Sequence, residues 1–228
     1  MQNEKPILFQ AEMVRAILSG QKTQTRRIIK NQAWLIDLEF DDSGWPIACD
    51  PESGEWYKIK CPLGEVGDQL WVREAWAGDA QLDHIKPSEF SRGEPIYYPA
   101  TRHVITSGCM MGDIGKTRPS IFMPRKFSRI QLEIKSIKVE RLQSISEEDA
   151  LAEGLAKISK DGETFKYGIP DLDGYPGDDD IGWHWHNWQP TAKLAFKRLW
   201  RLINGAESWD INPWVWAIEF ERIEARHG

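Results

Sequence analysis

The sequence predicts an α+β fold, a small mixed β-barrel flanked by short helices, in one domain that spans residues 1–228. Short helical segments and many short strands follow one another, without the regular strand–helix alternation of a parallel sheet. Two stretches, about 75–125 and 156–189, contain few periodic apolar residues and are expected to be long insertions. With 228 residues, 41% of them hydrophobic, the chain is long enough to bury a proper core.

The stretch from Ala11 to Lys30 predicts a helix, a turn and a strand. Apolar residues recur at helical spacing up to Ser19, and Gly20 stands where helices often end in a left-handed residue. In the strand, alternation places the odd-numbered residues 23–29 on one face and the even-numbered residues 24–30 on the other. Lys22 stands at the turn, close to Thr25, and a lysine beside a hydroxyl can serve as base to a nucleophile. On spacing alone, a solvated strand edge explains the same residues.

Further strands are expected where apolar and polar residues alternate. They are expected at 33–40 and 55–61, as a hairpin around a turn-rich segment, at 66–73, at 130–139 with a bulge near Ser136, and at 213–223. The strand at 66–73 begins with a Gly-Asp turn and is followed by Glu74. Glu74 is a secondary candidate for the site, and an ion pair with Arg73 or with one of the basic clusters is the favoured explanation of this residue.

Two more helices have clear start and stop signals. Ser146 is a good N-cap with Asp149 three residues later, and Gly154 ends this short helix. Glu153 is then the last helical residue, where the helix dipole disfavours negative charge and favours a carboxyl group that holds its proton, as a general acid must. A surface glutamate near a helix end is the alternative.

The second helix opens at Pro190 and stops at Asn204-Gly205. Its predicted buried stripe consists of Ala195, Phe196, Leu199, Trp200, Leu202 and Ile203.

Composition narrows the class of protein. A net charge of −6 argues against a protein that coats nucleic acid non-specifically, although basic residues cluster locally at 15–30 and 118–129. No apolar run approaches membrane-spanning length, so a cytoplasmic protein without membrane contact is expected. His184 and His186 lack a third ligand at a telling spacing, and the three cysteines match no zinc motif, so neither a metal nor another cofactor is expected.

Three elements, in the same order along the chain, resemble the ASCH family, the activating-signal-cointegrator homology domains related to PUA RNA-binding barrels. The first is Gly-x-Lys-x-x-Thr-x-Arg at residues 20–27, the second is the Gly-Asp turn with its strand at 67–73, and the third is the helix at 146–154. The phrases Trp-Val-Arg-Glu at 71–74 and Pro-Ser-Ile-x-Met-Pro-Arg at 119–125 are similar to those of phage and prophage members. The resemblance implies a PUA-like barrel and a prophage origin.

The resemblance also implies a function. One bacterial branch of the family hydrolyses the amide of N4-acetylcytidine, which would make Thr25 the nucleophile, Lys22 its base and Glu153 the proton donor to the leaving amine. Arg26, Arg27 and Glu74 are the expected substrate contacts. Related barrels instead bind RNA or a modified nucleic acid without catalysis, and Lys22 and the arginines would then contact phosphates or bases.

Overall fold

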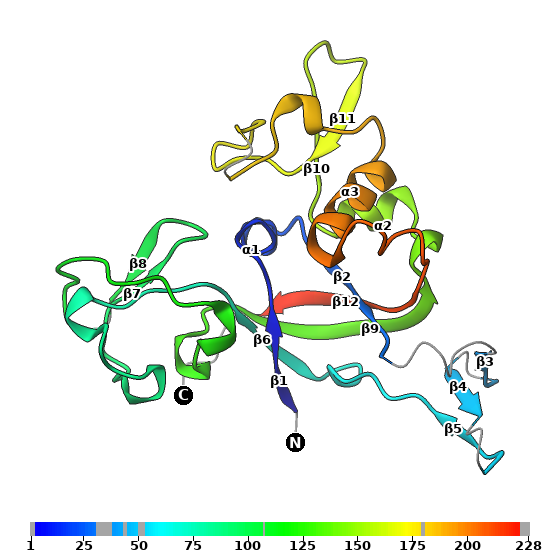
Figure 1. Cartoon of the computed structure of the whole chain (residues 1–228), viewed down its shortest axis with the longest axis horizontal. Coiled ribbons are helices and arrows are strands. Elements are labelled where there is room, and N and C mark those ends of the chain that lie inside the picture. The colour runs from blue at the N-terminus through cyan, green and yellow to red at the C-terminus, as the bar shows by residue number, and fades with distance from the viewer. Residues whose placement is uncertain are drawn as a thin grey trace. The chain divides into compact units, whose positions relative to one another are not determined.

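The computed structural model describes residues 3–30, 38–42, 45–49, 53–106, 108–178 and 181–223 (Figure 1). The predicted α+β class is confirmed, since the described residues form twelve strands and three α-helices. A closed barrel requires the first and last strands of one sheet to pair. No sheet among the described strands does so, because every sheet has a linear strand order. The structure thus supports a small mixed fold but not the closed barrel.

The chain forms two compact units, which are described separately. The first unit consists of Met1–Gly20, Asp68–Glu133 and Arg222–Gly228, and the second consists of Gln21–Gly67 and Ile134–Glu221. Each unit is therefore assembled from separate stretches of the sequence.

In the first unit, β1 (Glu4–Leu8) runs parallel to β6 (Gln69–Arg73), and β6 pairs antiparallel with the first residues of β9 (Gln131–Arg141). The helix α1 (Ala11–Leu18) follows β1 and buries one face, as its spacing predicts. Gly20 has φ +77°, the left-handed conformation expected at this helix end.

The predicted insertion at 75–125 has a small aromatic core of its own. Within it, β7 (Ile96–Tyr98) pairs antiparallel with β8 (His103–Ile105). Short 3₁₀ turns at Ala80–Leu82, Pro87–Glu89, Ser120–Phe122 and Arg125–Phe127 complete the segment. The buried residues of this core are Trp76, Phe90, Ile96, Tyr98, Met123 and Phe127. The segment is held by packed aromatic rings, which carry no helical or strand period.

Among the strands of the second unit, β12 lies between β9 and β2. The strand β2 (Gln24–Ile28) pairs antiparallel with β12 (Trp214–Ile223). Figure 1 shows the two long strands β12 and β9 side by side. The prediction of a single long strand at 130–139 is confirmed by β9. The alternation expected along the last strand is seen only in its second half, where Phe220 is buried and Glu221 is exposed. From Val215 to Ile218 all residues are buried, so both faces of β12 are covered there.

The helices of the second unit begin and end largely as expected. Ser146 caps α2 (Glu147–Ala152) by accepting a hydrogen bond from the Asp149 amide, and Gly154 follows with φ +102°. Glu153 is accordingly the residue at the C-terminal end of α2.

Thr191 caps α3 (Ala192–Asn204), and Gly205 ends it with φ +99°. The predicted stripe on α3 extends too far. Leu202 and Ile203 are 63% and 44% exposed and begin a stretch, 202–207, in which every residue is exposed to solvent.

Two stretches in which the sequence indicated no strand contain short strands. The turn-rich stretch between the expected hairpin strands contains β4 (Pro46–Cys49), which separates β3 (Glu39–Phe40) from β5 (Trp56–Lys58) in a three-stranded sheet. Residues 33–37 of the expected strand lie outside the described residues.

The insertion at 156–189 contains a hairpin of β10 (Ala156–Ser159) and β11 (Phe165–Gly168) and a 3₁₀ turn at Trp185–Asn187. Another 3₁₀ turn, at Leu142–Ser144, precedes α2. Asp161 closes this hairpin by accepting hydrogen bonds from the amides of Glu163 and Thr164. In the part of the chain that the structure covers, no helix is long and apolar enough to cross a membrane.

Candidate functional site

The ammonium group of Lys22 is buried and fully hydrogen-bonded. It donates to the Gln24 carbonyl at 2.7 Å, to the Glu153 carbonyl at 2.8 Å and to Glu153 Oε2 at 2.7 Å. The backbones of Lys22 and Glu153 also form an antiparallel bridge, and the Thr23 amide donates to the Ala152 carbonyl at 2.9 Å. The C-terminal end of α2 is therefore fixed to the residues that precede β2.

Arg26 is equally well occupied. Its side chain is 0% exposed, and its Nε donates to Glu140 Oε1 at 2.9 Å. Its Nη1 donates to Gln24 Oε1 at 2.7 Å and to Glu153 Oε1 at 3.1 Å, and its Nη2 donates to Asp149 Oδ2 at 3.1 Å. We call Lys22, Gln24, Arg26, Glu140, Asp149 and Glu153 the buried ionic cluster. All three nitrogen atoms of the guanidinium therefore donate hydrogen bonds, and these bonds fix the orientation of the carboxylates.

The cluster extends to β12 through Gln24. The Gln24 amide nitrogen donates to Asp149 Oδ1 at 3.0 Å and to Glu219 Oε1 at 3.1 Å. Glu219 in turn accepts a hydrogen bond from the Ser136 hydroxyl at 2.8 Å. The second unit therefore joins β2, α2, β9 and β12 through one polar network.

Burial controls the acid–base properties of the cations. Desolvation lowers the pKa of Lys22 from its usual value, and the adjacent Glu153 carboxylate opposes that effect. Burial likewise lowers the pKa of Arg27, again opposed by Glu153. A guanidinium stays protonated nevertheless, so Lys22 is the cation of the cluster that can release a proton.

The structure brings together two of the three predicted catalytic residues. Lys22 and Glu153 are 131 positions apart and share a contact of 2.7 Å between buried side chains. Thr25 is buried on β2, in register with Ile218 of β12. Strand alternation places the Thr25 side chain on the other face of β2 from Gln24 and Arg26, so the hydroxyl lies outside the buried ionic cluster.

The three predicted substrate contacts lie in different environments. Arg26 belongs to the buried ionic cluster, whereas Arg27 is half-buried and in register with Trp216. Glu74 lies in the first unit, is 1% exposed and accepts hydrogen bonds from Arg129 at 2.8 and 2.9 Å. The alternative explanation of Glu74, an ion pair with one of the basic clusters, is therefore the one observed.

Sequence reasoning missed much of the polar network. Gln24, Glu140 and Glu219 are isolated polar residues on strands, and Asp149 was interpreted only as part of a helix cap. The one available signal was the placement of Gln24 on the same strand face as Arg26, which indicates a polar face that needs partners.

The region around the two neighbouring histidines shows no metal geometry. His184 and His186 stack with ring centroids 4.9 Å apart and are both exposed. Within the described ranges, no three His, Cys, Asp or Glu side chains are grouped so that they could hold a metal ion.

Chemically, the buried lysine–carboxylate pair can do two things. It can stabilise the junction of α2 and β2 as an ion pair, or it can move one proton along a short hydrogen bond and become a neutral amine beside a carboxyl group.

Comparisons with protein-family models, with curated proteins and with solved structures gave no match.

Proposed function

We propose that this chain is an ASCH-type, PUA-like amidohydrolase that acts on an N-acylated nucleoside such as N4-acetylcytidine. The observation that carries the proposal is the 2.7 Å contact between Lys22 and Glu153, which joins two residues that the family resemblance implicates separately. Burial favours the neutral form of Lys22, the form that a base requires.

The pair supplies base and acid in one step. A proton that moves from Lys22 Nζ to Glu153 Oε2 leaves an amine that can accept a proton and a carboxyl that can donate one. Because strand alternation turns Thr25 to the other face of β2, the mechanism requires Thr25 Oγ1 to reach the Lys22 amine in the substrate complex. Thr25 Oγ1 then attacks the acyl carbon, the C–N bond breaks, and the exocyclic amine of the nucleoside leaves with the proton of Glu153. Water hydrolyses the resulting Thr25 ester, releases the carboxylic acid and restores the hydroxyl.

Two surrounding side chains modulate this chemistry. Arg26 Nη1 donates to Glu153 Oε1 at 3.1 Å and orients the carboxyl, although its charge favours the ionised form. Arg27 is half-buried on the same strand and carries a charge suited to a developing oxyanion.

The non-catalytic alternative, an RNA- or modified-nucleic-acid-binding module, is less well supported at this site. It requires Lys22 and Arg26 to contact phosphates or bases. Lys22 already donates to three acceptors and Arg26 to two carboxylates besides Glu153. A phosphate contact would have to displace these partners and expose buried charges.

The test is release of cytidine and acetate from N4-acetylcytidine by the purified chain, followed by liquid chromatography. Thr25→Ala should lower kcat by about a thousandfold or more, the scale of losing a nucleophile. Thr25→Ser should keep part of the activity, and Thr23→Ala, a matched change at the exposed neighbouring threonine, should keep nearly all of it. A parent protein without turnover, or a Thr25→Ala variant as active as the parent, would overturn the proposal.

A further inference from the structure

The helix α3 carries an unusual concentration of positive charge. Lys193, Lys197, Arg198 and Arg201 lie between Ala192 and Asn204, and the helix contains no Asp or Glu. The whole chain has a net charge of −6. A local excess of one sign on an otherwise acidic protein creates a positive potential that attracts anions.

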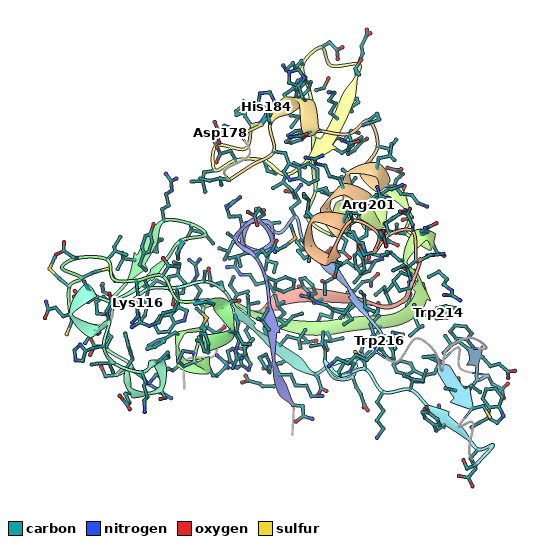
Figure 2. The ribbon with its side chains drawn as sticks, viewed as in Figure 1. Lys116, Asp178, His184, Arg201, Trp214 and Trp216 are labelled. Atoms are coloured by element: carbon teal, nitrogen blue, oxygen red, sulfur yellow. The ribbon has the colours of Figure 1, made fainter. Side chains whose placement is uncertain are left out.

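A cavity of about 460 Å³ lies against this helix. Its cationic side is formed by Lys197, Arg198 and Arg201, and Gln189 adds an amide. Leu194 and Leu202 line it as well and are 42% and 63% exposed. A volume of this order holds a small organic molecule, and the lining combines two leucines with three cationic side chains. Figure 2 labels Arg201 on α3, beside this cavity.

Arg198 carries a charge that no carboxylate neutralises among the described residues. Its guanidinium lies over the Trp183 ring, with 5.2 Å between the guanidinium carbon and the ring centroid, and its Nε is buried without a hydrogen-bond partner. Stacking on a buried tryptophan fixes the plane of the guanidinium but satisfies none of its donors. A partly desolvated cation with unused donors is stabilised by an arriving anion.

Arg201 has donors to spare at the same cavity. Its Nη2 donates to Asp210 Oδ2 at 2.5 Å, whereas its Nε is buried and has no partner in the described part of the chain. The Asp210 carboxylate is 60% exposed, so this ion pair is exchangeable with solvent and weak. Lys197 adds a third, half-buried cation one turn away on the same helix.

We propose that the cavity on α3 is a binding site for the phosphate group of a nucleotide. Arg198 and Arg201 would bind the phosphate oxygens, with Lys197 adding charge, and the exposed leucines would cover the apolar face of the nucleoside. The site contains no residue of the buried ionic cluster. The inference therefore does not depend on the proposed hydrolase.

The test is isothermal titration calorimetry of the full chain with cytidine 5′-monophosphate, cytidine and a single-stranded oligocytidylate. Arg198→Gln and Lys197→Gln remove one cation each from the cavity, and Lys138→Gln removes one from an exposed position on β9 as the matched control. Arg198→Gln should weaken phosphate-dependent binding about tenfold or more, the value of a charged hydrogen bond. Lys138→Gln should change it less than about twofold, because surface charges are screened.

The outcomes separate the two sources of phosphate. Binding of the monophosphate that Arg198→Gln weakens and that cytidine does not reproduce supports the site, with a free nucleotide as ligand. Binding of the oligocytidylate alone, with the same dependence on Arg198, supports it with a polynucleotide backbone as the source. Absence of both, cytidine binding as tightly as its monophosphate, or equal losses in Arg198→Gln and Lys138→Gln would overturn the proposal. Because binding is measured, a chain that fails to hydrolyse N4-acetylcytidine leaves this result intact.

Discussion

Replacing Lys22 with methionine should lower the free energy of unfolding by about 3 kcal/mol, the lower end of the cost of removing one partner from a buried ion pair. The two side chains are 1% and 5% exposed, so solvent cannot replace the lost partner. Glu153 keeps Arg26 as its second cation at 3.1 Å, which limits the cost. Methionine fills similar volume, so little of the loss comes from packing.

The magnitude of the coupling follows from the geometry. At the observed 2.7 Å, Coulomb's law with an effective dielectric constant of about 20 gives an attraction of roughly 6 kcal/mol. Desolvation of the two charges offsets several kcal/mol of this attraction. We therefore expect a coupling energy of about 2–3 kcal/mol between Lys22 and Glu153.

A double-mutant cycle measures this coupling directly. Urea unfolding of Lys22→Met, Glu153→Gln and the double variant should give a double-variant loss smaller than the sum of the single losses by that coupling energy. The control is Lys135→Met at the exposed pair with Glu221, whose side chains are 43% and 68% exposed, and it should cost less than about 0.5 kcal/mol. Single losses that add to within about 0.5 kcal/mol would refute the buried pair.

Two further predictions concern the pH dependence of stability and the carboxylate of the first unit. Because burial lowers the pKa of Lys22 in the folded chain, the unfolded chain binds that proton more tightly, and the free energy of unfolding should rise with pH from the lowered pKa to about 10.4. Lys22→Met should flatten this part of the curve of urea midpoint against pH, and an unchanged slope would contradict the assignment. Glu74→Gln should cost about 3 kcal/mol by leaving the Arg129 guanidinium without its carboxylate, with the KM for N4-acetylcytidine unchanged. A raised KM at unchanged stability would instead assign Glu74 to the substrate.

Local signals in the sequence predicted the local structure well. Gly20, Gly154 and Gly205 end helices with positive φ, and Ser146 caps α2 as its residue type and spacing indicate. The strands β4, β8, β10 and β11 escaped prediction, and each has only three or four residues. Strands this short depend on pairing with a neighbour more than on their own composition.

The candidate site could be predicted only in part. Lys22 and Glu153 were identified through a family resemblance, and no periodicity links residues that far apart in the sequence. Glu140 and Glu219 join the network only because β9, β12 and β2 lie side by side. Strand order of this kind is a property of the whole chain, which local patterns do not encode. The same limitation applies to Thr25. Its position in a strand was predicted, but its distance from Lys22 and from a bound substrate could not be.

The interleaving of the two units has a consequence for biosynthesis. The first unit needs residues from three separate stretches, including Arg222, whose Nη1 donates to the Leu18 carbonyl at 3.1 Å. On the ribosome, Leu18 therefore cannot make this contact until residue 222 has been translated. A protein whose domains follow one another along the sequence avoids this delay, because each domain can fold before the next one is synthesised. For this protein, slowed or truncated translation should leave unpaired apolar strands available to chaperones and to aggregation.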